Sequence, residues 1–275
     1  MKETILITGC SSGIGRLCAE QLHEAGYTVV ASCRKPEDVA TLQQQGLNCI
    51  QLDLDDTDSI HQGIEACLAI TGGRIDVLFN NAAYGQPGAL EDLPTQALRQ
   101  QFETNLFGWH ELTQAVIPIM LKHGSGKIVQ NSSVLGLVAM KYRGAYNASK
   151  FALEGYTDTL RLELRDTPLH VSLIEPGPIE SHFRENAKLK FEQYIDMAGS
   201  RHHSSYQKTL ERLGKSSPSN KFTLTPDAVL KPLQAIIHSE RPKPRYYVTQ
   251  PTHIFGFLRR ILPVRWLDQL LSKSN

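Results

Sequence analysis

Apolar and polar positions follow a repeating order along most of the chain. Short apolar runs of strand length are separated by longer stretches in which apolar positions recur with helical spacing. Strands are predicted at residues 4–8, 28–33, 49–52, 75–79, 127–129 and 170–174, and helices at residues 13–25, 36–45, 56–70, 95–121 and 145–165. Strands that alternate with such helices form βαβ units. The pattern therefore predicts the α/β class, with a single doubly wound parallel sheet covered by helices on both faces.

The pattern is weaker in the last third of the chain. Between residues 182 and 222 it gives way to a polar segment containing His and Ser, which we interpret as an insertion that forms a helical lid. Residues 241–245, RPKPR, are expected to form a connector before a last short strand at 246–249. The expected organisation is one domain, residues 1–250, followed by an amphipathic C-terminal tail, residues 251–275.

Composition narrows the classes of function. With 275 residues and 41% hydrophobic residues, the chain can bury the core of one α/β domain with a small appendage. Its 29 Lys and Arg balance 28 Asp and Glu, and basic residues do not interleave with aromatic ones, so we expect no nucleic-acid partner. Neither a signal peptide nor a membrane-spanning run is apparent, which favours a cytoplasmic location. Five cysteines without CxxC spacing are expected to be reduced and mostly buried: Cys10, Cys18, Cys33, Cys49 and Cys67.

The stretch ILITGCSSGIGRLCAEQL, residues 5–22, places three glycines between a predicted strand and a predicted helix. At Gly9, Gly13 and Gly15 the unpaired N–H groups and the helix dipole would favour an anion such as a pyrophosphate. Their spacing differs from the G-x-G-x-x-G of most dinucleotide-binding folds, and glycines also occur where a chain only needs a tight turn. A dinucleotide site and a simple turn both fit this stretch on its own.

A second candidate site lies in the stretch QNSSVLGLVAMKYRGAYNASK, residues 130–150. Tyr146 and Lys150 are four residues apart on a predicted helix and therefore share a face. A nearby ammonium would favour the phenolate and lower the tyrosine pKa, which makes the pair a candidate proton donor and acceptor. The alternative is structural, with the tyrosine packed at a helix interface and the lysine extended to solvent.

Taken together, these motifs and several others resemble the short-chain dehydrogenase/reductase family over about residues 1–183. The matching features are TGCSSGIG, NNAAYG at 80–85, Asn105, Ser133, the YNASK that contains Tyr146, and PGPIES at 176–181. The resemblance implies a Rossmann-type fold. The SCRKP after the second strand, the LIEPGPIE segment and a tail rich in Leu and Arg are similar to the branch with 17β-hydroxysteroid dehydrogenase-like and retinol dehydrogenase-like members and bacterial NADP-dependent aldehyde reductases.

The resemblance implies four catalytic residues. Tyr146 would give a proton to a carbonyl oxygen as hydride arrives from nicotinamide, and Lys150 would lower the pKa of Tyr146 and bind the nicotinamide ribose. Ser133 would hydrogen-bond the developing alkoxide. Asn105 would hold a water that relays protons to Lys150, although an asparagine at such a position can also mark only a bend or a polar contact in a helix.

The resemblance also implies a set of cofactor-binding residues. Asn80 would brace the sheet near the adenosine, Asp53 would meet the adenine amino group, and residues 176–181 would grip the nicotinamide amide. The full set is Gly9, Ser11, Ser12, Gly13, Ile14, Gly15, Arg34, Asp53, Leu54, Asn80, Ala82, Tyr146, Lys150, Pro176, Gly177, Ile179 and Ser181. One residue departs from the family pattern: Ala83 stands where Asn-Asn-Ala-Gly has its glycine, and its methyl group could narrow the approach of the cofactor.

Charge after the second strand distinguishes between the two dinucleotides. An NAD-binding chain should offer an acid to the ribose 2′-OH, whereas an NADP-binding chain should offer an arginine to the 2′-phosphate. Cys33, Arg34 and Lys35 occupy this position, so NADP(H) is favoured. No metal is expected, because zinc-type His and Cys spacings are missing, and His202 and His203 are expected to be solvated.

Apolar residues recur at helical spacing in the tail, on both sides of Pro263 and with arginines between them. Such a segment could dock on the body or on a second subunit of a homo-oligomer, roof a substrate pocket, or make a peripheral contact with a membrane surface. We therefore expect an NADP(H)-dependent oxidoreductase for lipophilic aldehydes or ketones. The alternatives are an NAD-linked hydroxysteroid dehydrogenase and a non-catalytic NADP-binding redox sensor.

Overall fold

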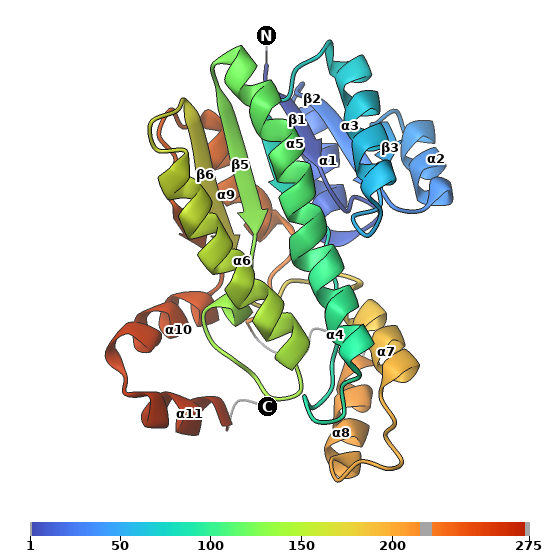
Figure 1. Ribbon diagram of the computed structural model, residues 1–275, viewed down its shortest axis with the longest axis vertical. Coiled ribbons are helices and arrows are strands. Elements are labelled where there is room, and N and C mark those ends of the chain that lie inside the picture. The colour runs from blue at the N-terminus through green and yellow to red at the C-terminus, as the bar shows by residue number, and fades with distance from the viewer. Residues whose placement is uncertain (1, 215–221, 273–275) are drawn as a thin grey trace.

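A computed structural model describes residues 2–214 and 222–272 of the chain. Within these residues, seven parallel strands form one sheet in the order β3-β2-β1-β4-β5-β6-β7 (Figure 1). The strands are β1 (Thr4–Ile7), β2 (Thr28–Cys33), β3 (Asn48–Gln51), β4 (Val77–Asn80), β5 (Gly126–Asn131), β6 (Leu169–Glu175) and β7 (Arg245–Tyr247). The order reverses between β1 and β4, which confirms the predicted doubly wound, Rossmann-type sheet. Such sheets bind ligands at this switch point, beyond the carboxyl ends of the strands.

Helices cover both faces of the sheet, as the periodicity predicts (Figure 1). One layer contains α1 (Gly13–Glu24), α2 (Pro36–Gln44) and α9 (Asp227–His238), and the other contains α3 (Thr57–Thr71), α5 (Gly108–His123) and α6 (Gly144–Glu163). Alternate residues of β1 face the two layers, because side chains alternate along a strand. Ile5 and Ile7 therefore pack with α1 and α9, whereas Leu6 packs with α3 and α5.

The structure differs from the predicted elements in three places. The helix expected at 95–121 is divided into α4 (Thr95–Phe102) and α5 by a π-helical turn, Glu103–Phe107, whose Asn105 side chain bonds the loop after β4. The last strand is Arg245–Tyr247 rather than 246–249, because Thr249 already caps the next helix. Helix α9 lies where no element was predicted. Pro232 within it usually indicates a break in a helix.

Two further pairs of helices extend beyond the carboxyl ends of the strands (Figure 1). The segment expected to be a lid is helical, with α7 (Phe183–Tyr194) and α8 (His203–Leu213). The tail forms α10 (Gln250–Ile261) and α11 (Val264–Ser272), which confirms its predicted helical pattern. Residues 215–221 of the lid and 273–275 of the tail lie outside the described residues.

The prediction of a solvated side chain is wrong for His202, which an aromatic cluster covers, whereas His203 is partly exposed. The His202 ring packs edge-to-face on Tyr142, with ring centres 5.3 Å apart, and its Nε2 lies 2.9 Å from a carboxylate oxygen of Glu91. Tyr206 is buried within the same cluster. The lid segment is polar overall, but aromatic side chains within it pack against the body of the protein.

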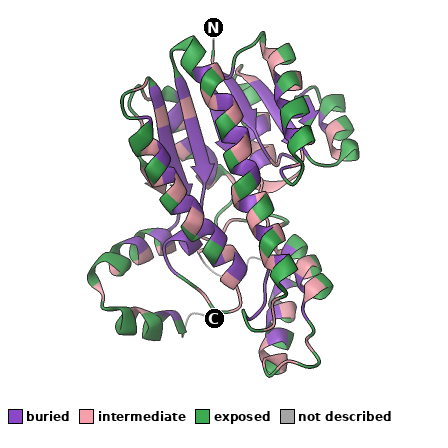
Figure 2. Ribbon diagram, in the orientation of Figure 1, coloured by how far each residue is buried: buried purple, intermediate pink, exposed green. Residues whose placement is uncertain are grey.

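Buried residues line the sheet and the inner sides of the surrounding helices (Figure 2). All five cysteines are buried and unpaired, as predicted. Among the described helices, none has both the length and the apolar character that crossing a membrane requires.

Candidate active site

The glycine-rich turn lies between β1 and α1, at the switch point of the sheet. Gly9 has a left-handed φ of +73°, and a Cβ placed on it would lie only 2.7 Å from Cα of Ala82. A Cβ on Gly13 would lie 3.0 Å from Cβ of Ser181. Two other segments that the sequence assigns to the cofactor, around Ala82 and Ser181, therefore approach this turn closely.

The N-terminus of α1 points into the space beside this turn. Its N-cap residue, Ser12, makes no side-chain capping bond, so backbone N–H groups of the first turn remain available to an anion. A Cβ on Gly15 would collide with the Gly9 carbonyl oxygen, so only glycine lets the helix begin this close to the turn. Ser11 is exposed, and Ile14 packs against the core of the α1 layer. The arrangement fits a dinucleotide pyrophosphate.

Two predicted cofactor segments follow β2 and β3. Arg34 is exposed directly after β2, and its carbonyl oxygen accepts a hydrogen bond from Gln51 Nε2 at 3.2 Å. Asp53 is partly exposed, and its Oδ1 accepts the Asp55 N–H at 3.1 Å. Leu54 is buried and packs with the core of the α3 and α5 layer. Arg34 and Asp53 thus lie beyond the carboxyl ends of β2 and β3, on the same side of the sheet as the switch-point site. Leu54 is mainly a core residue.

Asparagines join the strands near the turn. The buried Asn80 donates from Nδ2 to Thr113 Oγ1 of α5 at 3.0 Å, a bracing contact of the kind that the sequence predicted. Its neighbour Asn81, which the sequence analysis overlooked, donates to the Thr8 carbonyl at 2.9 Å and accepts from Asn131 Nδ2 at 2.8 Å. Asn81 therefore links the ends of β1, β4 and β5. The signal for it was the NN pair at the end of a predicted strand.

The π-helical turn presents Asn105 to the site. The Tyr84 N–H donates to Asn105 Oδ1 at 3.2 Å, and Asn105 Nδ2 lies 3.0 Å from the Tyr84 carbonyl and 3.2 Å from Ser149 Oγ. The side chain thus connects the loop after β4 to the residue just before Lys150. π-Helical turns often occur at functional sites. The predicted water-mediated link to Lys150 stays a prediction.

Ser133 and Tyr146 lie side by side at the end of β5 and the start of α6. Ser133 caps the 3₁₀ turn Val134–Gly136, where its Oγ accepts the Leu135 N–H at 3.1 Å. Burial raises the pKa of Tyr146 to about 12, and a side-chain hydrogen bond with Ser133 opposes this shift. The sequence predicts a lowered pKa for Tyr146, whereas burial of the phenol raises it; that Lys150 favours the phenolate stays a prediction.

Lys150 is almost completely buried, with 1% of its surface exposed. Its Nζ donates to the Asn131 carbonyl at 2.8 Å and lies 4.5 Å from the centre of a Trp109 ring and 5.8 Å from the centre of the Tyr146 ring. Burial lowers the pKa of Lys150 to about 7, and Glu154 opposes this shift. A lysine ammonium carries three N–H donors. One of them bonds the Asn131 carbonyl, and the remaining donors of Lys150 suit the hydroxyls of a ribose.

The loop after β6 closes the site. Pro176 is buried, and its carbonyl oxygen accepts the Val134 N–H at 2.8 Å, next to Ser133. Gly177 lies against the side chain of Thr249. Ile179 packs against the core, and Ser181 is exposed at the start of the lid. The loop therefore runs from the catalytic candidates to the glycine-rich turn, and the grip of residues 176–181 on the nicotinamide amide stays a prediction.

Apolar residues of the tail complete the surroundings of Tyr146. The side chains of Phe255, Leu267 and Leu271 cluster with Val134 and with the Tyr146 ring. The sequence left open whether the tail packs here, because amphipathic spacing does not reveal the partner. Elsewhere in the described chain, no group of three or more His, Cys, Asp or Glu side chains could hold a metal ion.

A dinucleotide turn at the switch point, with Ser133, Tyr146 and Lys150 beside it, defines the site of a dinucleotide-dependent oxidoreductase. Residues 3–191 match the model of the family described as short chain dehydrogenase, and the chain belongs to this family. It is an NAD(P)-dependent oxidoreductase of the class that acts on CH–OH and C=O groups.

Similar proteins support this assignment. The chain is 41% identical over 272 residues to the uncharacterized oxidoreductase YbbO of Escherichia coli, covering 99% of this chain and 95% of that one. It is 42% identical over 190 residues to human retinol dehydrogenase 8, covering 66% of this chain and 60% of that one. The crystal structure of a short chain dehydrogenase/reductase from Burkholderia phymatum in complex with NAD has a TM-score of 0.78 and 26% identity, covering 100% of this chain and 96% of that one.

Proposed function

We propose that the protein reduces lipophilic aldehydes or ketones to alcohols with NADPH, and that Tyr146 supplies the proton. The observation that carries the substrate class is the apolar cluster around the Tyr146 ring, which combines residues of α6, the 3₁₀ turn and the tail. A proton donor surrounded by such side chains favours substrates that bury an apolar chain or ring beside the reacting carbonyl. The name of human retinol dehydrogenase 8, a relative that acts on an apolar alcohol, supports the same class.

The proton step follows from the Tyr146 hydroxyl. A phenol with a pKa of about 12 remains protonated at neutral pH and is therefore a proton donor rather than a base. An alkoxide is far more basic than a phenolate, so the Tyr146 Oη proton passes to the carbonyl oxygen as that oxygen gains negative charge. Ser133 Oγ, which is held by the cap of its turn, orients this oxygen. This state of Tyr146 favours reduction.

The bound dinucleotide supplies the hydride. Backbone N–H groups at the start of α1 would hold its pyrophosphate, Lys150 would hold its nicotinamide ribose, and residues 176–181 would hold the amide. Asn105 positions the loop that carries Tyr84 and the α6 turn just before Lys150. Together these residues would determine where each part of the dinucleotide lies, from the pyrophosphate at the sheet edge to the nicotinamide amide beside the lid.

Cationic side chains after β2 support NADPH over NADH. Arg34 and Lys35 are exposed at the end of β2, where an NAD-binding chain would place an acid for the ribose hydroxyl. An arginine there offers charge-assisted hydrogen bonds to a 2′-phosphate. Lys35 lies 3.8 Å from Glu37, so part of its charge is offset, and Arg34 is the stronger candidate.

A carbonyl panel assayed with each cofactor tests the proposal. Straight-chain aldehydes of increasing length, retinal and a steroid ketone are offered to the full-length enzyme with NADPH or NADH. We expect kcat/KM to rise with apolar size and to be at least about tenfold higher with NADPH. Tyr146→Phe, as a control for the chemistry, should retain NADPH binding and lose roughly 10²–10⁴-fold in rate.

Two outcomes would contradict the proposal. Equal or better rates with NADH on steroid ketones would indicate the NAD-linked hydroxysteroid dehydrogenase instead. Tight NADPH binding without turnover of any carbonyl would indicate a non-catalytic redox sensor.

A further inference from the structure

The two tail helices, which lie beyond the carboxyl ends of the strands (Figure 1), expose an unusual amount of apolar surface. Five large apolar side chains of these two helices are each more than half exposed: Ile254, Phe257, Ile261, Val264 and Trp266. In the rest of the described chain, comparably exposed apolar side chains such as Leu162 and Leu189 belong to different helices. A concentration of this kind usually marks a binding surface rather than ordinary surface composition.

Helix α10 is apolar on two sides for different reasons. Ile254, Phe257 and Ile261 are three and four residues apart, so they form one stripe along the helix. On the other side, Gly256 is buried against the protein and Phe255 joins the cluster that contains Tyr146. The inner side thus explains how α10 is held, whereas the outer stripe contributes little to that packing.

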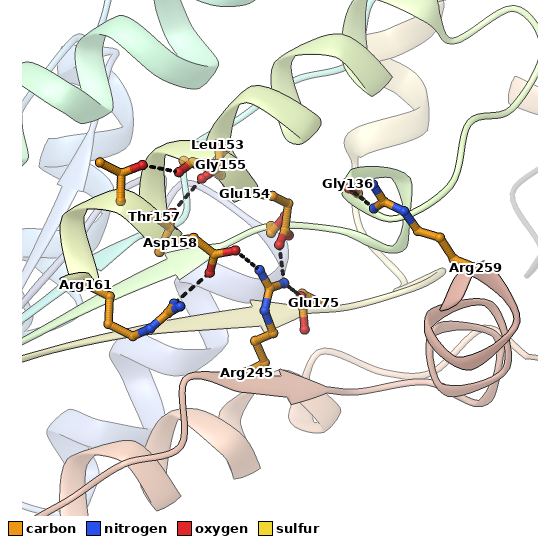
Figure 3. Close-up of polar contacts among 12 residues, drawn as sticks. Gly136, Leu153, Glu154, Gly155, Thr157, Asp158, Arg161, Glu175, Arg245 and Arg259 are labelled. Atoms are coloured by element: carbon orange, nitrogen blue, oxygen red, sulfur yellow. Dashed lines mark hydrogen bonds and ion pairs between the residues drawn. The ribbon is translucent and has the colours of Figure 1, made fainter. Parts of the chain in front are cut away.

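Cationic side chains border the outer stripe. Arg260 lies three residues after Phe257, which places the two side chains next to each other on the helix surface, and Arg265 precedes Trp266. Both arginines are exposed. Arg259 is also exposed, but its guanidinium is engaged with the protein, because Nη1 donates to the Gly136 carbonyl at 3.4 Å (Figure 3). The single acidic residue of the two described tail helices is Asp268.

We propose that the exposed apolar stripe of α10, together with the exposed residues at the start of α11, docks on an anionic lipid bilayer. The apolar stripe would enter the boundary between headgroups and acyl chains, and Arg260 and Arg265 would pair with lipid phosphates. Trp266 suits this boundary because its ring is apolar and its N–H is a donor. Two copies of the chain meeting through the same surface would instead bring four exposed arginines together against two Asp268 carboxylates. The charge distribution therefore favours lipid over a second copy.

Docking in this orientation has a consequence that rests on the proposed function. Phe255 and Leu271, on the inner sides of the helices that touch the bilayer, cluster with Tyr146. A lipophilic carbonyl dissolved in the membrane would therefore reach the proton donor along apolar side chains without crossing bulk water. Membrane binding itself can be measured without any turnover, so its failure and failure of the proposed activity are distinguishable.

Vesicle flotation of the full-length protein tests the docking surface. The protein is mixed with phosphatidylcholine vesicles, with or without added phosphatidylglycerol, and the floated fraction is measured. We expect strong flotation only with the anionic lipid. Phe257→Ser with Trp266→Ser should abolish it, and Arg260→Gln with Arg265→Gln should weaken partitioning about 25-fold, with each lost charge contributing about fivefold.

Matched variants control for general surface effects. Leu162→Ser with Leu189→Ser removes two equally exposed apolar side chains, and Lys122→Gln with Lys208→Gln removes two exposed cations from other helices. Both pairs should float like the unmodified protein. Since all substituted side chains are exposed, circular dichroism melting curves should stay unchanged.

Three results would overturn the proposal. The first is no flotation with anionic vesicles, and the second is equal flotation of the tail and control variants. The third is a dimer in sedimentation velocity without lipid that Phe257→Ser with Trp266→Ser dissociates, because this would assign the surface to a second copy of the chain.

Discussion

The ring of Phe183, the first residue of α7, meets the ring of Tyr146 edge-to-face with centres 5.3 Å apart. Another part of the same ring covers Gly85, because a Cβ placed there would lie 2.7 Å from Phe183 Cζ. Phe183 therefore fills the space between the loop after β4 and the proton donor. This contact joins the lid directly to the proton donor.

A double-mutant cycle can test this link. Gly85→Ala should push the Phe183 ring away from Tyr146 and raise KM for a long-chain aldehyde, whereas NADPH affinity should change little. In a Phe183→Ala background the same substitution should have almost no effect, since the colliding ring is gone. We expect a coupling energy of about 1 kcal/mol, in the range found for residues in contact. Additive effects on kcat/KM would show that the two residues act independently.

Buried Lys150 should make stability depend on pH. Its pKa of about 7 lies below the ordinary value of 10.5, so between these values the unfolded chain binds the proton and the folded protein does not. Stability should therefore rise with pH from about 7 to 10.5, by up to about 1 kcal/mol per pH unit. The contribution is present in full above 10.5 and is lost as the pH falls through about 7.

Urea unfolding of the wild type and of Lys150→Met, compared at each pH without added nucleotide, measures this effect. The stability difference should change in favour of the wild type as the pH rises through the window. A difference that is constant with pH would mean that Lys150 keeps its proton in the folded protein.

The carboxylates around Arg245 predict an opposite pH dependence. Arg245 bonds Glu154, Asp158 and Glu175, which joins α6, β6 and β7 beneath the site (Figure 3). Burial, and then the neighbouring Glu154, raises the pKa of Glu175 to about 8, although Arg245 opposes the shift. The stability that Glu175 contributes is thus complete below its ordinary pKa of 4.5 and is lost as the pH rises through about 8.

Glu175→Gln keeps a neutral side chain at every pH and should remove this dependence. Relative to the wild type, the variant should gain stability between pH 5 and pH 9, measured by urea unfolding. The exposed Glu163→Gln on α6 serves as the control and should show no such trend. Parallel curves for Glu175→Gln and the wild type would contradict the raised pKa.

Arg34 is expected to determine the choice of cofactor. Arg34→Ala should lose a charge-assisted contact with the 2′-phosphate, worth roughly 1.5–3 kcal/mol. NADPH affinity should then fall about ten- to a hundredfold or somewhat more, and NADH affinity should stay nearly constant. Fluorescence titration with both nucleotides measures this. Equal losses with the two cofactors would assign Arg34 to the fold instead of to the phosphate.

Local sequence patterns were sufficient for the fold, for the glycine-rich turn and for the Tyr146–Lys150 pair, whereas most other candidate site residues were implied by the resemblance to the family. Strand and helix periodicity located the elements of the sheet within two residues up to β6, apart from the π-helical turn, because burial on one or both faces imposes a period on the chain. The glycines of residues 9–15 and the Tyr146–Lys150 pair could be found because their chemistry depends on short, fixed spacings. Such signals lie within a few consecutive residues.

Other features depend on contacts between distant residues. The sequence treated residues 241–245 as a connector, yet Arg245 bonds Glu154, 91 residues earlier, and this pairing has no local signal. Asn81 connects three strands, and His202 is covered by an aromatic cluster instead of by water.

The protonation of the site was also decided by tertiary structure. Spacing on α6 predicts that Lys150 and Tyr146 are neighbours, and from this alone a lowered tyrosine pKa follows. In the folded protein, burial raises the pKa of Tyr146 and lowers that of Lys150. Desolvation depends on every element packed around a group, whereas spacing reports only the partner on the same helix. The sequence by itself therefore determined that Tyr146 and Lys150 are neighbours, and only the packing around them decided which of the two holds its proton.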